Sequence, residues 1–340
     1  MEIIIGLLII AVGSFAQSSS YVPINKVKGW SWESYWLVQG IFAWIVFPLI
    51  GILFVTVPTG VSIFDLYAGQ SLFGSIFYGM LWGIGGLTFG LSMRYLGVAM
   101  GQSIALGTCS AFGTLFPALF AGENLFAGEG LVLLIGVSIA IAGIAVIGYA
   151  GALRSKNMSI EDQRKAVKEF ALTKGLIVAL MAGVMSACFN LGLGAGKEIE
   201  ISVRALGSSK MFSLTPVILL VTLGGAITNF TYCIFQNIKN KTFSDYVQGR
   251  HLINNLLFCV LAGCLWYSQF FGLSMGKAFL QDSPVMIAFS WSILMSLNIL
   301  FSNVWGLILK EWKGVGRKTY IILSIGLAIL IFSLIFPNII

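Results

Sequence analysis

The sequence predicts an all-α membrane protein of ten transmembrane helices, arranged as two inverted repeats of five helices. Three observations lead to this fold class. The 340 residues contain ten stretches of mostly apolar residues, each near the roughly twenty residues that a helix needs to cross the hydrocarbon core. Charged residues make up only 10% of the chain, whereas about a quarter is usual in a soluble domain. The connections are short, so no soluble domain is expected.

The first apolar stretch, residues 2–20, could also be a signal peptide, because it ends in Gln17-Ser18-Ser19-Ser20. A signal peptide begins with positive charge, and Glu2 is the only charge here. We therefore predict a membrane helix. The other nine helices are predicted at 33–56, 72–92, 96–117, 129–150, 174–194, 211–236, 252–273, 284–308 and 319–337.

Polar residues recur at helical spacing inside several spans. In chain order they are Gly13, Gln17 and Ser20; Ser103, Gly107, Ser110 and Thr114; Ser186 and Asn190; Thr222 and Asn229; Trp266, Tyr267 and Gln269; and Trp291, Asn298, Ser302 and Trp305. Polar groups inside a bilayer turn toward a partner or a cavity. Helix packing and a substrate cavity both remain open as interpretations. In the third span, Gly79, Gly83, Gly86 and Gly90 form a smooth face that we interpret as helix contact.

Lysine and arginine residues are distributed unevenly over the connections. With the N-terminus outside, sixteen of the twenty fall in connections on the inner side. The four on the outer side are Lys197, Arg204, Lys210 and Lys277. Because cytoplasmic connections carry the excess of positive charge, both termini are predicted on the exterior, periplasmic side.

A repeated pattern relates the two halves of the chain. Leu81-Trp82, followed by Phe89-Gly90-Leu91-Ser92-Met93, recurs as Leu265-Trp266, followed by Phe271-Gly272-Leu273-Ser274-Met275. We predict a first repeat at 1–151, a charged cytoplasmic connection at 152–173 and a second repeat at 174–340. An odd number of crossings per repeat makes the second copy run inverted. Inverted repeats are typical of secondary transporters, which hold the substrate near the bilayer midplane, so the pattern indicates a carrier.

The sequence disfavours several other classes of protein. The net charge of +7 does not indicate nucleic-acid binding, because the basic residues lie in short connections and form no face with interleaved aromatics. No cofactor and no metal site are predicted, since the five cysteines lie inside apolar spans and His251 is the only histidine. A membrane transferase would need clustered acids for a metal-bound diphosphate, so no enzyme is predicted. A structural or sensory membrane protein would not require the inverted duplication.

Aromatic and amide side chains inside the spans are typical of a neutral-sugar site. Aromatic faces pack against the C–H surfaces of a sugar, and amides reach its hydroxyls in an otherwise apolar pocket. The candidate substrate-binding residues are Trp82, Asn190, Trp266, Gln269, Trp291 and Asn298. Anchoring at the membrane interface is an equal alternative for the tryptophans.

A proton-coupled carrier also needs a carboxylate within reach of the cavity, because burial makes its protonation depend on access. The acids close enough to a span are Glu33, Glu198, Glu200 and Asp282. The proton-coupling candidates are Asp282 and Glu33. The alternative for Asp282 is an N-cap before Pro284 at the start of the ninth helix.

Several local strings resemble the L-rhamnose-proton symporter family of the drug/metabolite transporter superfamily. They are Lys26-Val27-Lys28-Gly29-Trp30-Ser31-Trp32-Glu33, Leu81-Trp82-Gly83-Ile84-Gly85, Met93-Arg94-Tyr95-Leu96-Gly97, Leu265-Trp266-Tyr267-Ser268-Gln269-Phe270-Phe271 and Leu309-Lys310-Glu311-Trp312. The resemblance implies a ten-helix symporter of the cell inner membrane that imports L-rhamnose, a 6-deoxyhexose, with protons.

The chain departs from this family at the ninth helix. The resemblance leads us to expect a Tyr-Asp-Tyr string before Ser290-Trp291, where Ile287-Ala288-Phe289 stand instead. Because the nearest acid is Asp282, another deoxysugar or uncoupled transport is an alternative. An exporter of another small metabolite on the same fold is a second one. A cationic-drug carrier is disfavoured, because no acid lies well inside the first five spans.

Overall fold

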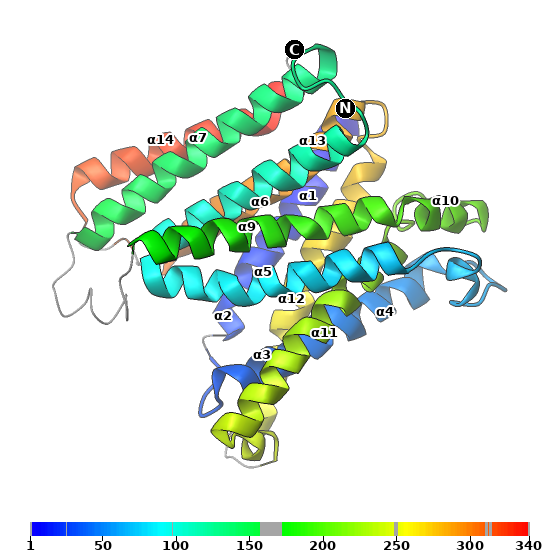
Figure 1. The fold of residues 1–340 in the computed structure, drawn as a ribbon, viewed down its shortest axis with the longest axis horizontal. Coiled ribbons are helices and arrows are strands. Elements are labelled where there is room, and N and C mark those ends of the chain that lie inside the picture. The colour runs from blue at the N-terminus through cyan, green and yellow to red at the C-terminus, as the bar shows by residue number, and fades with distance from the viewer. Residues whose placement is uncertain are drawn as a thin grey trace. The chain divides into compact units, whose positions relative to one another are not determined.

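The computed structural model describes residues 2–24, 26–96, 98–156, 172–247, 251–309, 312 and 315–338, and the regular elements in them are helices (Figure 1). The long ones are α1 (Glu2–Ser19), α5 (Phe73–Leu96), α6 (Val98–Phe120), α7 (Gly128–Lys156), α9 (Leu172–Ala195), α11 (Thr215–Asn240), α12 (Leu252–Ala278), α13 (Pro284–Ile308) and α14 (Arg317–Ile335). The second span consists of α3 (Trp32–Ile41), η1 (Phe42–Val46), α4 (Phe47–Gly51) and η2 (Ile52–Thr56). Short helices are α2 (Tyr21–Ile24), η3 (Asp65–Tyr67), α10 (Lys197–Ala205), η4 (Phe243–Tyr246) and η5 (Phe336–Asn338).

The ten predicted spans coincide with these long elements. Within the described residues, nine helical segments are long and apolar enough to cross a bilayer. The helix α6 is a tenth candidate: its apolar part, Ile104–Phe120, is shorter, but its 23 residues rise about 34 Å at about 1.5 Å per residue, more than the roughly 30 Å of the hydrocarbon core. The chain is therefore an all-α integral membrane protein, as predicted.

The chain divides into two compact units, each built from two separate segments. Unit 1 comprises Met1–Gly83 and Gly192–Phe279, and unit 2 comprises Ile84–Leu191 and Leu280–Ile340. Two of the three boundaries fall inside long helices, so α5 and α9 contribute to both units, and the third falls between α12 and α13. The predicted repeats at 1–151 and 174–340 describe a sequence duplication, which is a different division of the chain, and they stay a prediction.

In unit 1, small residues bring α1 and α12 together (Figure 1). A Cβ atom added to Gly13 would lie 2.8 Å from the carbonyl oxygen of Ser268, and one added to Gly276 would lie 2.8 Å from that of Gly6. There is no room for a methyl group at either position. The close approach of the two backbones is the usual way in which transmembrane helices gain packing energy.

The second span of unit 1 is interrupted by two π-helical turns. The turns η1 and η2 flank the short α4, which has Pro48 in its first turn. Proline donates no backbone hydrogen bond and disturbs a regular helix. Single π-helical turns inside α-helices occur often at functional sites, which makes this span a candidate part of the site.

In unit 2, α7 packs along α14 and against α6 (Figure 1). A Cβ atom added to Gly143 would lie 3.1 Å from the carbonyl oxygen of Gly326. The core near this contact consists of Ile144, Ile147, Ala150, Ile299, Trp312, Leu323 and Leu330. Arg154, in the last turn of α7, lies over the ring of Trp312 at 5.4 Å from its centroid, where a cation is stabilised by both the ring and the helix dipole.

The predicted glycine face of α5 is a packing surface over only part of its length. A Cβ atom added to Gly79 would collide with the carbonyl oxygen of Val221, and one added to Gly83 would lie 2.8 Å from Cβ of Thr228. Both partners belong to α11. Cβ atoms added to Gly86 or Gly90 would meet no described atom within 4 Å. The contact interpretation is therefore confirmed for the first two glycines, and the other two make no such contact.

Candidate functional site

Two of the predicted sugar contacts, Trp82 and Trp266, lie together in unit 1. Their ring centroids are 5.8 Å apart, with an interplanar angle of 35°. Trp44 of η1 packs edge-on against both, at 6.0 Å from Trp82 and 6.2 Å from Trp266. Trp36 of α3 and Phe230 of α11 each lie 5.8 Å from Trp44. We call these five residues the aromatic cluster.

Trp44 occupies the centre of the aromatic cluster. Its side chain is 2% exposed, and its indole N–H has no acceptor among the described residues. Trp36, by contrast, donates to Oδ1 of Asn229 at 2.9 Å. The amide of Asn229 in turn donates to the carbonyl oxygens of Gly225 and Gly83, at 2.9 and 3.3 Å. Asn229 therefore holds Trp36 in place, while Trp44 keeps an unused donor.

Two buried glutamines accompany the aromatic cluster. Gln269 donates from Nε2 to the carbonyl oxygen of Trp266 at 3.1 Å. Gln39 follows Trp36 by three residues, and its Oε1 atom is buried without a donor in the described part of the chain. Because burying an unpaired polar atom costs about 1–3 kcal/mol, Oε1 of Gln39 and Nε1 of Trp44 are groups that a polar ligand would satisfy.

The other three predicted sugar contacts lie in unit 2. Asn190 of α9 donates from Nδ2 to a backbone carbonyl of α6 at 2.6 Å. Trp291 of α13 stacks on Phe189, with ring centroids 5.8 Å apart, and donates to another backbone carbonyl of α6 at 3.3 Å. Asn298 is buried about two turns further along α13. The indole N–H of Trp291 and one amide N–H of Asn190 are thus engaged by the protein itself.

Glu33, in the first turn of α3, is a buried carboxylate of unit 1. It is 6% exposed and accepts hydrogen bonds from Nδ2 of Asn240 at 2.8 Å and from Oγ1 of Thr242 at 3.1 Å. Both donors are neutral, and they come from the end of α11 and the residues after it. Neither of these two hydrogen bonds to Glu33 is an ion pair.

Asp282, the other proton-coupling candidate, is exposed in the turn before α13. The N-cap of α13 is Ser283, whose side chain accepts from the backbone N–H of Met286 at 3.4 Å. The alternative interpretation of Asp282 as the N-cap is therefore wrong by one residue. Serine and aspartate cap helices about equally well, and Pro284 does stand in the first turn, so the sequence left both residues possible.

A further acid of unit 1, Asp245, lies in η4, outside the spans. Ser31 donates to its Oδ2 atom from the backbone N–H at 2.9 Å and from the hydroxyl at 2.8 Å. Burial raises the pKa of Asp245, but the hydrogen bonds from Ser31 and the hydroxyl of Ser34 outweigh it, so the pKa is lowered overall. Asp245 is therefore ionised at neutral pH and ties η4 to the start of α3.

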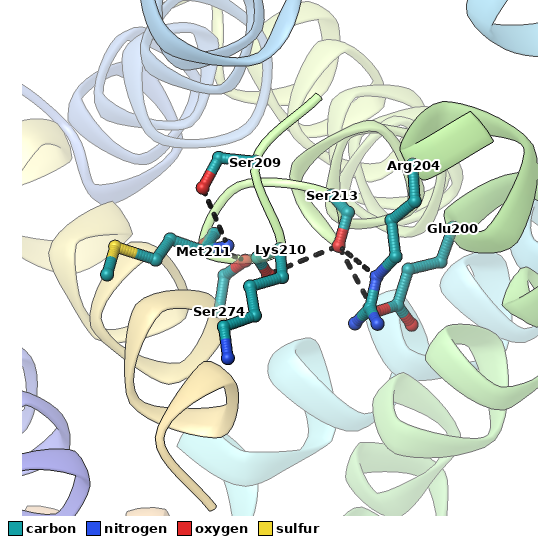
Figure 2. A network of polar contacts seen from close by, with 7 residues as sticks. All are labelled: Glu200, Arg204, Ser209, Lys210, Met211, Ser213 and Ser274. Atoms are coloured by element: carbon teal, nitrogen blue, oxygen red, sulfur yellow. Dashed lines mark hydrogen bonds and ion pairs between the residues drawn. The ribbon is translucent and has the colours of Figure 1, made fainter. Parts of the chain in front are cut away.

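Polar contacts at the end of α10 connect it to the following loop, which is held by α12 (Figure 2). Arg204 pairs with Glu200 at 2.6 Å and donates from Nε to Oγ of Ser213 at 3.0 Å. Ser274 of α12 donates to the carbonyl oxygen of Met211 at 2.8 Å. Glu200, one of the acids near a span, is thus engaged in an ion pair.

Comparison with known proteins gives these residues a family context. The protein family described as L-rhamnose-proton symport protein (RhaT) matches residues 1–339. The chain belongs to this family. It is 36% identical over 341 residues to the L-rhamnose-proton symporter of Mannheimia succiniciproducens, covering 98% of this chain and 96% of the relative. It is 34% identical over 338 residues to those of Yersinia pestis (strain Pestoides F) and Yersinia pseudotuberculosis (serotype O:1b), covering 97% of this chain and 96% of each relative.

The L-rhamnose-proton symport family consists of transporters, which confirms two predictions from the sequence. The resemblance first seen in short strings extends over the whole chain. The chain is a transporter and not an enzyme, as the lack of clustered acids in the sequence indicated.

For this member of the symport family, sequence reasoning found two residues of the aromatic cluster and missed Trp36, Trp44 and Phe230. Trp36 and Trp44 are eight residues apart, which in a regular helix turns their side chains about 80° away from each other. The π-helical turn η1 contains Trp44 and changes this register, so helical spacing does not reveal the pair. A signal was present nonetheless, because Trp36, Gln39 and Trp44 bring polar atoms into an otherwise apolar span.

Proposed function

We propose that this chain is a secondary active transporter that imports L-rhamnose, or a similar deoxysugar, together with protons by alternating access. Its relatives over nearly the whole length are L-rhamnose-proton symporters, and this favours symport over export or uncoupled transport. The observation that carries the proposal is the aromatic cluster, with its buried, unused indole N–H, in a member of this family. Aromatic rings suit the apolar C–H and methyl surface of a deoxyhexose, and a hydroxyl would accept from the indole.

The sugar contacts that we propose in unit 1 are Trp82, Trp266 and Gln269, together with Trp44 and Gln39. They are supported by the mutual packing of the rings and by the unpaired polar atoms of Trp44 and Gln39. In unit 2, Asn298 stays a proposed contact. Trp291 is less favoured as a sugar contact, because its single donor is used by a backbone carbonyl, and Asn190 is less favoured because its amide is held on a backbone carbonyl by one of its two N–H groups.

We assign the coupled proton to Glu33 ahead of Asp282. Glu33 is buried, and its hydrogen-bond partners are the neutral side chains of Asn240 and Thr242. A carboxylate enclosed inside a span can exchange its proton only with the side to which the site opens, as coupling by alternating access requires. Asp282 is exposed in this conformation.

The proposed location is the cell inner membrane, with both termini on the periplasmic side and the two five-helix halves inverted. The excess of basic residues in alternate connections supports this orientation. The composition of the compact units supports the duplication for the second, fourth and fifth spans of each half, whereas α1 lies in unit 1 and most of the corresponding α9 in unit 2. Unit 2 holds α6 with α13 and α7 with α14, the fourth and fifth spans of each half.

Proton coupling is tested in a lightly buffered suspension of cells that produce the protein. Adding L-rhamnose should make the external medium more alkaline, because each imported sugar removes protons from it. Uptake of labelled L-rhamnose without a pH change would contradict the coupling. No uptake of any deoxysugar would contradict the substrate class.

The proton site is tested by Glu33→Gln, with Asp282→Asn as the matched neutralising variant. Glutamine keeps an acceptor for Asn240 and Thr242 but cannot exchange a proton, so the chain should still fold. Glu33→Gln should abolish sugar-dependent alkalinisation while labelled L-rhamnose still exchanges across the membrane. If Asp282→Asn uncouples transport and Glu33→Gln does not, Asp282 carries the proton.

A further inference from the structure

The helix α6 contains a proline in its interior, at position 117. In a regular helix the carbonyl oxygen of Gly113 would accept from the backbone N–H four residues later. Residue 117 has no N–H, so this carbonyl loses its intrahelical partner. An unpaired carbonyl inside a bilayer costs several kcal/mol, and another donor is therefore expected there.

Asn190 of α9 supplies that donor. Its Nδ2 atom lies 2.6 Å from the carbonyl oxygen of Gly113, and both helices belong to unit 2 at these positions. The asparagine of α13 at position 303 behaves differently, because its Nδ2 atom donates at 2.9 Å to the carbonyl oxygen of Ile299 in its own helix. The carbonyl of Ile299 has a backbone donor as well, in Asn303 itself. Asn190 thus reaches the one carbonyl that Pro117 leaves unpaired.

Trp291 covers the same stretch of α6. Its Nε1 atom donates to the carbonyl oxygen of Cys109 at 3.3 Å, one turn before Gly113. A Cβ atom added to Gly113 would collide with the indole nitrogen of Trp291, so only glycine leaves room for this ring. The other face of the contact is formed by Phe189, the neighbour of Asn190, on which Trp291 stacks.

We propose that Asn190 is a positioning residue for transport. Its amide donates to the carbonyl oxygen of Gly113 and so replaces the backbone hydrogen bond that Pro117 cannot make. When this side-chain hydrogen bond is released during the transport cycle, α6 can bend at Pro117. Prolines are the commonest cause of a local bend in a helix, and a side-chain donor on a neighbouring helix can be released where a backbone donor cannot. This role differs from a direct sugar contact, and the two make opposite predictions for a double variant.

The test is a double-mutant cycle with Asn190→Leu and Pro117→Ala, read by the melting temperature of the purified protein in detergent without sugar. Leucine keeps the branched shape of asparagine, is larger and donates no hydrogen bond, and the Asn303→Leu control carries the same increase in volume. Asn190→Leu alone should lower the melting temperature. In the Pro117→Ala background the backbone N–H is restored, so Asn190→Leu should have less than half that effect. Asn303→Leu is the matched control, and its effect should be the same with Pro117 or alanine at position 117.

The outcomes of this cycle separate the possibilities. If Asn190→Leu does not fold but the double variant does, the proposal is supported in its strongest form. If Asn190→Leu lowers the melting temperature equally in both backgrounds, or neither variant folds, compensation of Pro117 is wrong. The melting temperatures are measured without sugar, so this result does not depend on which substrate the protein transports.

The functional part of the proposal rests on the proposed sugar transport and is read separately. Pro117→Ala should lower the maximal rate of L-rhamnose uptake about tenfold while leaving equilibrium binding of L-rhamnose unchanged, which converts to about 1.4 kcal/mol in the barrier. An unchanged rate would overturn the flexing role. If Asn190 contacts the sugar instead, Asn190→Leu will weaken binding equally in the Pro117→Ala background.

Discussion

Trp44 and Trp36 differ in whether the indole N–H has an acceptor within the described part of the protein. Both are tryptophans of the second span, and they pack against each other in the aromatic cluster. The indole N–H of Trp36 is used by Asn229, whereas that of Trp44 has no acceptor among the described residues. An unpaired buried donor is unfavourable in the empty protein. A hydrogen bond from the indole of Trp44 to a sugar hydroxyl would therefore increase the affinity of the protein for the sugar.

Replacing Trp44 by phenylalanine should weaken sugar binding in a protein that still folds. Phenylalanine keeps an aromatic ring but is smaller than the buried indole, so the melting temperature of the empty protein should fall, although less than in Trp36→Phe, because no bonded N–H is lost. The dissociation constant for L-rhamnose should increase about 2- to 10-fold, the worth of one net hydrogen bond. Equilibrium binding of labelled L-rhamnose to the purified protein measures it.

Trp36→Phe is the matched control for this prediction. It leaves the buried Oδ1 atom of Asn229 without its donor, so the melting temperature should fall. If Trp44→Phe leaves the dissociation constant unchanged, Trp44 does not donate to the sugar.

Asp245 should make the stability of the connection at η4 depend on pH. Its pKa in the folded protein is lowered below the ordinary value of 3.8. Ionised Asp245 therefore stabilises the folded state above pH 3.8, and the contribution is lost as the pH falls through the lowered pKa. The melting temperature of the wild type should exceed that of Asp245→Asn at pH 7, and the difference should shrink toward zero in stronger acid.

The hydroxyl of Ser31 provides an internal check of this pH dependence. Ser31→Ala removes one of the hydrogen bonds that lower the pKa of Asp245. The pH-dependent difference should become smaller in this background. A difference that grows in acid would mean that the pKa of Asp245 is raised and not lowered.

At the scale of elements, the sequence predicts what depends on local composition and misses what depends on contacts. The spans were predictable because a run of about twenty apolar residues has the length and composition of a helix that crosses the hydrocarbon core. The π-helical turns of the second span were not, because Pro48 alone does not distinguish a kink from a π turn. Which glycines of α5 make contact depends on where α11 lies, and Gly79, Gly83, Gly86 and Gly90 look alike in the sequence.

The glycines of α5 give a paired prediction. Gly79→Ala should greatly reduce the yield of folded protein, because the added methyl group would overlap the carbonyl oxygen of Val221 and neither backbone can move cheaply. Gly86→Ala adds the same methyl group to the same face of α5, about two helical turns further along. At this position no described atom lies within 4 Å of the added methyl group. Its yield and melting temperature should match the wild type, as measured by fluorescence-detected size exclusion after extraction. Equal losses in both variants would mean that helix α5 does not pack as described.

At the scale of the whole molecule, the sequence predicted a chain of many membrane spans but not the compact units. Each unit joins segments from both halves of the chain, and such long-range grouping leaves no trace in periodicity or composition. The same limit applies to the candidate site. Trp82 and Trp266 were predicted as aromatic residues inside the spans, whereas adding Trp44 to them required knowledge of which helices meet.

The orientation of the whole chain is the last testable prediction. Ten crossings put both termini on the same face, and sixteen of the twenty basic residues would then lie in cytoplasmic connections if that face is the exterior. Alkaline phosphatase fused after residue 340 should therefore be active, since it folds only outside, and green fluorescent protein at the same site should be dark. A fusion after Lys156, at the end of α7, should give the reverse result. Fluorescence at the C-terminus together with an exterior N-terminus would require an odd number of crossings, and the inverted five-helix repeats could not then exist.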